Sequence, residues 1–283
     1  MKANSTNLSD SLGIVGCGWV GKPLAEQLLQ QQFSVVVTSS RADNVAKLID
    51  KGLTAEQLHL PCSQEELVDK KVFAQQTLLI AITPLFRQGR TDYADKVKAL
   101  VQAAKAQGKV KRLILLSSSA VYNGLVGEVT EASQLDLTAD KVAILQQAEQ
   151  EVLSFSANSV VMRLAGLVGP ERHPGNFLRK KLQSNNNVFH DGHAHVNLIH
   201  QADVVGLLLA ILQHGNLGGI YNGVSETNAS KQMYYQTAAK SIGLPVPEFA
   251  VPENIAASKV VLGDKARRDF NYQFVYPDLL AWL

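Results

Sequence analysis

Residues 12–21 of the chain read LGIVGCGWVG, and this stretch decides the fold. The apolar run of residues 12–15 predicts a buried β-strand. Glycines follow at positions 16, 18 and 21, which is the spacing GxGxxG, and residues 20–32 are predicted to form a helix. A strand, a glycine-rich turn and a helix in this order are typical of a βαβ unit that binds a dinucleotide.

Each glycine has its own task in such a turn. Gly16 permits the tight bend, Gly18 lets the backbone approach a pyrophosphate, and Gly21 lets the helix pack closely on the strand. The helix N-terminus adds amide donors and a favourable dipole for the phosphates. The same terminus is expected to lower the pKa of the Cys17 thiol, which leaves a redox-sensing role open beside a space-filling one. The whole loop is predicted to bind the cofactor: Gly16, Cys17, Gly18, Trp19, Val20 and Gly21.

Outward from this stretch, short apolar runs alternate with segments of helical length. Alternation of this kind produces right-handed crossovers, so we predict an α/β fold with a doubly wound parallel sheet of the Rossmann type. The predicted strands span residues 12–15, 34–37, 77–82, 112–116 and 159–164, and the predicted helices span residues 20–32, 92–107 and 138–155.

The composition changes after Gly169-Pro170 to loops rich in Gly, Pro, Asn and His. We therefore predict two domains that interleave along the chain. The predicted dinucleotide-binding Rossmann domain comprises residues 11–169 plus 196–223, and the predicted smaller C-terminal substrate domain comprises residues 170–195 plus 224–283. Residues 1–10 are polar and predict a flexible tail before the first strand.

The overall composition excludes several classes of protein. A formal net charge of +2, with 46% hydrophobic and 18% charged residues, is ordinary for a globular chain and gives no electrostatic case for nucleic acid binding. No apolar run approaches the roughly 20 residues needed to span a membrane. The first residues lack the apolar region of a signal peptide, and two cysteines cannot build a disulfide framework, so a cytoplasmic protein is predicted.

The segment HDGHAH at 190–195 contains possible metal ligands, but Asp-Gly is also a turn signal, and no metal site is predicted.

The residues after the second predicted strand indicate which dinucleotide is bound. An NAD-preferring site has an acidic residue about 20 positions after the glycines, where it bonds the ribose hydroxyls. This chain instead reads Thr38-Ser39-Ser40-Arg41, without a carboxylate. Hydroxyls and a guanidinium suit a 2′-phosphate, so Ser39, Ser40 and Arg41 predict NADP, with NAD possible.

Four motifs in order resemble the extended short-chain dehydrogenase/reductases, the NAD-dependent epimerase/dehydratase-like proteins that act on nucleotide sugars. They are the glycine loop, LSSSAVY at 116–122, RLAGLVGP at 163–170 and VNLIHQADV at 196–204. The third motif, with the RHPG that follows it, looks closer still to an atypical branch, the YeeZ-like proteins. The resemblance runs from about residue 11 to the C-terminus, and further cofactor contacts are expected from Ile82, Thr83, Pro84, Ser117 and Leu164.

The resemblance implies a catalytic serine and a YxxxK pair, and only the serine is present. In the family the serine that polarises the substrate stands three positions before the Val-Tyr pair, which is Ser118 here. The family's tyrosine falls at Lys141 and its lysine at Leu145, and no tyrosine occurs between Asn123 and Arg163. Tyr122 and Lys141 are therefore the candidate substitutes for the missing acid/base group.

These patterns support two functions of different classes. The first is an NADP(H)-dependent oxidoreductase or epimerase-like enzyme that acts on a small polar substrate, which His173 and Asn176 are expected to contact. The second is a non-catalytic NADP(H)-binding regulator or redox sensor, which the missing YxxxK pair suggests. The resemblance also implies a possible homodimer, formed by packing helices 92–107 and 138–155 against their copies.

Overall fold

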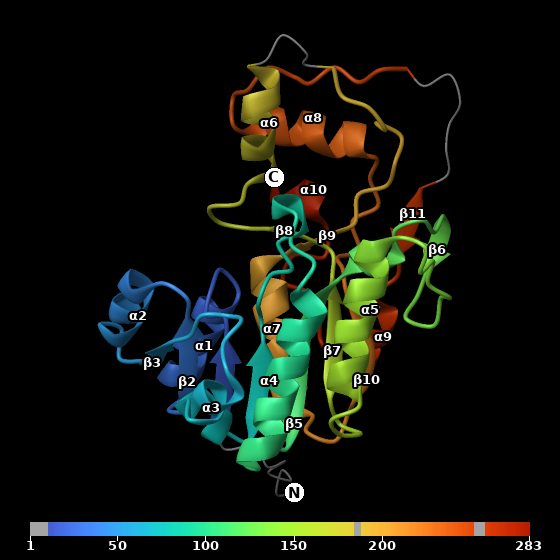
Figure 1. Cartoon of the computed structure of the whole chain (residues 1–283). Coiled ribbons are helices and arrows are strands. Elements are labelled where there is room, and N and C mark those ends of the chain that lie inside the picture. Colours follow the sequence, from blue (N-terminus) through green and yellow to red (C-terminus); the bar gives the residue numbers. More distant parts are fainter. Residues whose placement is uncertain (1–10, 184–187, 252–257) are drawn as a thin grey trace, which may run out of the picture.

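The computed structural model describes residues 11–183, 188–251 and 258–283. The predicted flexible tail of residues 1–10 lies outside these ranges. Within the described residues, seven parallel strands form the central sheet in the order β10-β7-β5-β4-β1-β2-β3 (Figure 1). The strands are β1 (Ser11–Val15), β2 (Ser34–Ser39), β3 (Thr54–Gln57), β4 (Thr77–Ile80), β5 (Arg112–Ser118), β7 (Val160–Leu164) and β10 (Gly219–Gly223).

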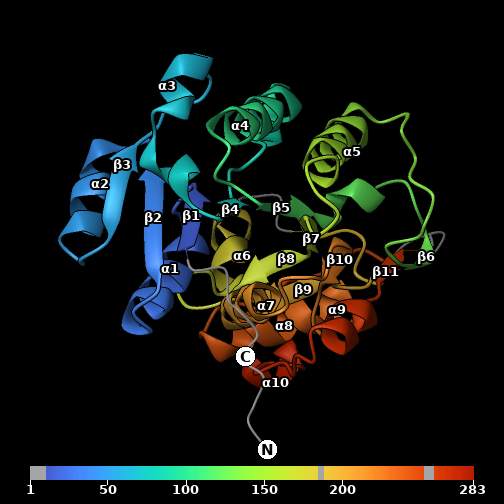
Figure 2. The ribbon, with the colours of Figure 1, turned by 90° about the horizontal axis from the view of Figure 1, so that it is seen from below.

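Helices cover both faces of this sheet, as Figure 2 shows. One face carries α3 (Gln64–Val68), α4 (Tyr93–Gln107) and α5 (Asp140–Leu153), and the other carries α1 (Gly21–Gln30), α7 (Gln201–Gln213) and α9 (Asp264–Asp269). Helix α2 (Ala42–Ile49) lies beside β3 at the edge of the sheet. The predicted doubly wound Rossmann-type sheet is therefore confirmed, and all five predicted strands belong to it.

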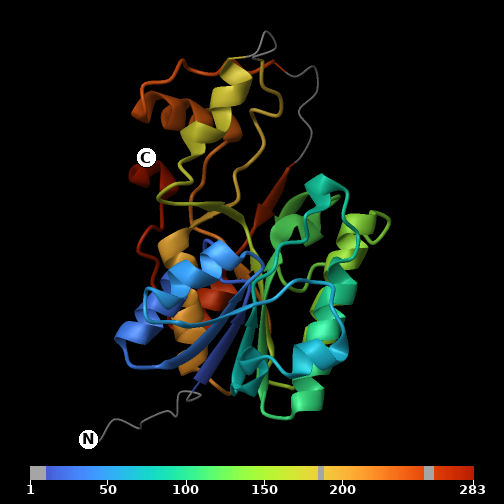
Figure 3. The same cartoon turned by 60° about the vertical axis from the view of Figure 1, so that its left-hand side comes forward.

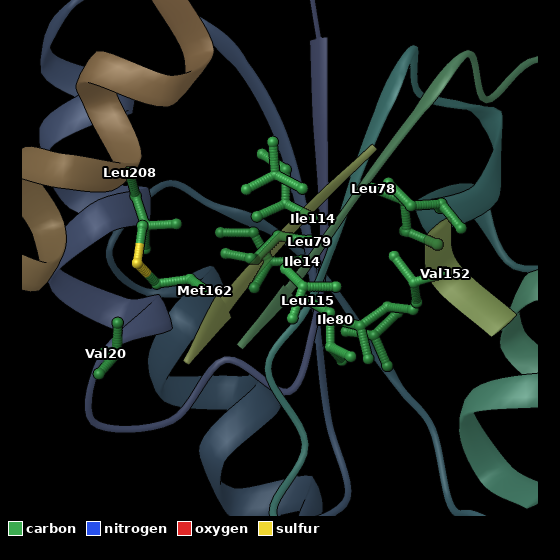
Figure 4. Packing of buried hydrophobic residues seen from close by; sticks show 14 of the residues in the cluster. Ile14, Val20, Leu78, Leu79, Ile80, Ile114, Leu115, Val152, Met162 and Leu208 are labelled. Atoms are coloured by element: carbon green, nitrogen blue, oxygen red, sulfur yellow. The ribbon is translucent and has the colours of Figure 1, made fainter. Parts of the chain in front are cut away.

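The core is apolar because the central strands are buried on both faces. Leu79, Ile80, Ile114 and Leu115 are each at most 1% exposed. Figure 4 shows these side chains gathered around the sheet, with Met162 pointing toward the helices that cover it. Complete burial of one such side chain contributes about 1.5–3 kcal/mol, so the continuous apolar runs of the sequence carry most of the fold's stability.

An apolar stripe on helix α4, within the predicted helix at 92–107, is used inside the chain. Val97, Leu100, Val101 and Ala104 of α4 are all at most 1% exposed. The stripe covers the sheet and its neighbour α5, so it offers no free surface to a second copy. The homodimer stays a prediction.

Additional elements lie beyond the carboxyl ends of the strands (Figure 3). Two short parallel pairs join there, β8 (Gly166–Val168) with β9 (Leu198–His200) and β6 (Gly127–Val129) with β11 (Lys259–Val261). Helices α6 (Pro174–Leu182), α8 (Lys231–Ser241) and α10 (Leu279–Trp282) lie above them (Figure 1). Helices α6, α8 and α10 and strand β11 fall within the predicted smaller domain, whereas β6, β8 and β9 fall within the range predicted for the Rossmann domain. Helix α9, which also falls within the predicted smaller domain, packs against β10 of the main sheet, and the domain boundaries stay a prediction.

The sheet order places a crevice at its carboxyl edge. From β1 the chain proceeds outward to β2 and β3, whereas β4, β5 and β7 lie on the other side of β1. At such a reversal the loops after neighbouring strands turn to opposite faces and leave room for a ligand.

Among the described residues, no helix has the length and apolarity to cross a membrane.

Candidate functional site

The glycine loop has the geometry that a dinucleotide requires. Gly16 has a φ of +95°, and a Cβ there would lie 2.9 Å from the Ala81 carbonyl oxygen, so only glycine fits. A Cβ on Gly21 would lie 3.1 Å from the Gly16 carbonyl oxygen, which shows how closely the helix approaches the turn. A Cβ on Gly18 would meet no heavy atom within 4 Å, so this backbone faces open space. Thr38 of β2 holds the loop, because its Oγ1 accepts a hydrogen bond from the Gly16 amide at 3.2 Å.

The pKa of Cys17 is raised, whereas the sequence predicted that it would be lowered. The residue is 4% exposed, and burial raises the pKa of its thiol to about 12, with the charge of Glu26 adding to the effect. Desolvation of a thiolate thus outweighs the helix terminus that was expected to lower this pKa. The space-filling interpretation of Cys17 fits the structure, and an activated thiol does not.

A cavity of about 360 Å³ opens where β2 ends. Ser39, Ser40 and Arg41 line it together with Cys17, and no lining residue is a carboxylate. The guanidinium of Arg41 is exposed and forms an ion pair with Asp43 at 2.7 Å. An exposed pair of this kind is worth about 0–1 kcal/mol, so a bound anion can displace it at little cost.

A second cavity, of about 690 Å³, lies between the glycine loop and the ends of β4, β5 and β7. Ser118 lines it, and its Oγ accepts a hydrogen bond from the Ala120 amide at 3.1 Å. The two cavities together gather all the predicted cofactor residues, because this one is lined by Gly16, Gly18, Trp19, Val20, Gly21, Ile82, Thr83, Pro84, Ser117 and Leu164.

Sequence reasoning missed three polar residues of the larger cavity: Tyr93, Arg87 and Arg172. The Arg172 guanidinium lies 4.5 Å from the centre of the Trp19 ring, which is a cation–π contact. Arg172 stands in the sequence motif after Gly169-Pro170, but nothing in that motif indicated that it would reach the glycine loop. The Tyr93 hydroxyl is buried and has no hydrogen-bond partner among the described residues.

The two proposed acid/base substitutes lie apart from this cavity. Tyr122 is completely buried, and its hydroxyl donates to Asn222 Oδ1 at 2.8 Å and accepts from Arg163 Nη1 at 2.9 Å. Burial raises the pKa of this phenol. Lys141 is exposed near the start of α5, and it lines neither cavity.

Buried polar side chains around Tyr122 form a network that stabilises the loop carrying Ser118. Glu149 of α5 is 1% exposed and forms an ion pair with Arg163 of β7 at 2.7 Å. The Ser117 hydroxyl donates to Glu149 Oε1 at 2.6 Å. Because a buried charge needs its partners, this network fixes the end of β5 immediately before Ser118.

His173 and Asn176, the residues predicted to contact the substrate, lie outside both cavities. His173 precedes α6, where its Nδ1 accepts from the Gly175 amide at 3.2 Å, and its ring lies 5.6 Å from the Trp282 ring. The Asn176 Oδ1 accepts from Arg179 Nε at 2.8 Å. Neither residue lines the two cavities. In the described part of the chain, no three His, Cys, Asp or Glu side chains group as a metal site would require.

Comparison with known proteins agrees with the resemblance in the sequence. Residues 14–222 match the sequence profile of the NAD dependent epimerase/dehydratase family. Protein YeeZ of Escherichia coli strain K12 is 31% identical over 277 residues, which is 95% of this chain and 97% of YeeZ.

Solved structures share the fold at lower identity. MoeE5 in complex with UDP-glucose and NAD is 20% identical with a TM-score of 0.74, and the match covers 96% of each chain. The human epimerase family protein SDR39U1 with NADPH is 18% identical with a TM-score of 0.73, over 96% of this chain and 97% of that one. The predicted resemblance is thus confirmed, and the chain belongs to the NAD dependent epimerase/dehydratase family.

Proposed function

We propose that the chain is an NADP(H)-dependent oxidoreductase or epimerase-like enzyme that acts on a small polar substrate. The observation that carries this proposal is the shape of the glycine loop. Its open backbone at Gly18 lies between a cavity at the end of β2 and a larger one at Ser118. One dinucleotide could occupy both cavities, with its pyrophosphate at the N-terminus of α1.

The cavity at the end of β2 favours NADP over NAD. Hydroxyls, among them those of Ser39 and Ser40, and the Arg41 guanidinium line it, and none of its lining residues is a carboxylate that would repel a phosphate or bond free ribose hydroxyls. The fold is shared with proteins solved with NAD and with NADPH, so the choice rests on this chain's own residues.

The larger cavity favours an enzyme over a pure sensor. A bound nicotinamide would supply or accept a hydride, while the protein orients the substrate and handles one proton. Ser118 would bond the reacting oxygen, and Arg87 and Arg172 would attract a polar or anionic substrate. MoeE5 was solved with UDP-glucose, which makes a nucleotide sugar a reasonable first substrate to test.

Tyr93 is the proton donor that the cavity itself suggests. It is the one phenol among the cavity's lining residues, and its hydroxyl lacks a partner among the described residues. Like any phenol it is protonated near neutral pH; burial raises its pKa, and Glu149 adds to the effect, which makes it a weak acid that would donate only to an oxygen as basic as a forming alkoxide. Tyr93→Phe should lower kcat with any substrate that is turned over while NADPH affinity stays unchanged; equal loss of both would contradict this role.

Cofactor choice is tested with two matched arginines. Arg41 and Arg90 are both exposed, and each pairs with an aspartate two positions later, but only Arg41 lines the cavity. Arg41→Ala should weaken NADPH binding about tenfold or more, which is at least 1.4 kcal/mol, and should leave NADH binding unchanged. Arg90→Ala should change neither. Equal NADPH affinity in the two variants would remove the case for NADP.

The second candidate, a non-catalytic NADP(H)-binding regulator, is favoured by the positions of Tyr122 and Lys141. Neither lines the cavity in which Ser118 lies. If the chain is such a regulator, it should bind NADPH as described above but turn over no substrate, and Ser118→Ala should change no activity. Turnover that is lost in Ser118→Ala would exclude it.

A further inference from the structure

A third cavity, of about 350 Å³, lies beyond the serine loop. Ser119 and Gly166 line it, whereas their chain neighbours Ser118 and Ala165 line the larger cofactor cavity. The two cavities therefore adjoin the same two chain segments. The volume falls within the roughly 300–1,000 Å³ that is usual for small-molecule sites.

Basic side chains from three separate parts of the chain meet in this cavity. Lys259 comes from β11, Lys231 from the start of α8, and His195 from the segment before β9 (Figure 1). Tyr235 of α8 adds a phenol, and no aspartate or glutamate is among the lining residues. The cavity therefore has an excess of positive charge.

The Lys259 amine is held in place by neutral groups. Its Nζ donates to the Ser119 carbonyl oxygen at 3.0 Å and to Asn123 Oδ1 at 2.7 Å. No carboxylate of the described residues lies within ion-pair distance of Lys259 or Lys231. Burial, with the nearby charge of Lys231, lowers the pKa of Lys259 to about 8. A partly buried cation without an anion is costly, and a bound anion would remove that cost.

We propose that this cavity is a subsite for the anionic group of the substrate, a phosphoryl or a carboxylate, which Lys259 and Lys231 hold. The hydrogen bond from Lys259 to Ser119 joins this subsite to the loop that carries Ser118. A single substrate could thus place its reacting carbon beside Ser118 and its anionic group between the two amines. The position of the reacting carbon rests on the proposed function, whereas anion binding by the two lysines does not.

The test uses inorganic phosphate and, separately, succinate as probes. Each is titrated at constant ionic strength into the full chain in the presence of excess NADP⁺, and binding is followed by calorimetry. Lys259→Met and Lys231→Met should each weaken phosphate binding about tenfold or more, because a charge-assisted contact is lost. Lys98→Met removes the same charge from an exposed position on α4 and should bind as wild type does. Binding of phosphate alone indicates a phosphoryl group, and binding of both probes indicates any anion.

Phosphate affinity that is equal in wild type and both pocket variants, or no anion binding by wild type, would overturn the proposal. Lys231→Met carries the test if Lys259→Met fails to fold, because the Lys231 side chain forms no hydrogen bond with the residues that the structure describes. A parallel NADPH titration separates the two claims. Lysine-dependent phosphate binding without NADPH binding would refute the proposed function alone, and NADPH binding with lysine-independent phosphate binding would refute the subsite alone.

Discussion

At the scale of single residues, burial decides what each polar group can do. Tyr122 follows the serine motif and resembles a catalytic residue in sequence, but its hydroxyl is already both donor and acceptor in a buried network. Tyr93 has no such partner among the described residues and lines the cavity. Sequence spacing cannot distinguish these cases, because the difference arises from side chains of β7 and β10 that lie far along the chain.

Burial of Cys17 predicts that its thiol reacts slowly with alkylating reagents in the native protein. Only the thiolate reacts with alkylating reagents, and burial that raises the pKa to about 12 leaves very little thiolate at pH 8. Iodoacetamide should therefore label Cys62, which is only partly buried, well before Cys17. Mass spectrometry of the native protein measures both sites, and the unfolded protein, in which both should react alike, is the control. Equal labelling in the native state would contradict the burial of Cys17.

At the scale of elements, the turn between β1 and α1 was predictable almost residue by residue. The glycine spacing, the preceding apolar run and the helix that follows all favour one local structure. The short edge strand β3 and the pairs β6–β11 and β8–β9 were missed, since three or four residues have too little periodicity to be recognised. Arg87, Arg172 and Lys259 were missed for a different reason, because only the tertiary structure brings these residues to their cavities.

The two glycines of this turn should respond differently to alanine. Gly16→Ala forces a side chain onto a φ of +95° and against the Ala81 carbonyl, so the free energy of unfolding should fall by roughly 1–3 kcal/mol. Gly18→Ala meets no neighbour and should change stability by about 0.5 kcal/mol or less. Urea denaturation of both variants measures this. A large loss in Gly18→Ala would show that the loop is packed more tightly than described.

At the scale of the whole molecule, a buried carboxylate attaches the C-terminal segment to the sheet domain. Asp203 of α7 is fully buried and accepts hydrogen bonds from the Tyr272 hydroxyl at 3.0 Å and from the amides of Val275 and Tyr276 at 2.6 and 3.1 Å. The overall fold was predictable because long apolar runs specify it. This attachment was not, since one aspartate in a polar motif gives no sign of its distant partners.

Asp203→Asn should loosen this attachment. The amide keeps one acceptor oxygen but turns its NH2 group toward one of the two backbone amides, which donate to different oxygens of Asp203, so the free energy of unfolding should fall by about 2 kcal/mol or more. Hydrogen exchange of residues 270–283 should accelerate more than that of the central strands. Asp95→Asn, at an exposed position on α4, is the control. Unchanged exchange in Asp203→Asn would mean that packing alone holds the segment.

Both proposed functions require that the glycine loop binds NADP(H), and nicotinamide fluorescence during titration with NADPH measures this binding. Wild-type protein should bind NADPH saturably, with a Kd on the order of micromolar. Gly18→Ala should bind about tenfold or more weakly while it stays fully folded, because its methyl group occupies the space of the pyrophosphate. Absence of NADPH and NADH binding by folded wild-type protein, or equal affinity in Gly18→Ala, would contradict the claim.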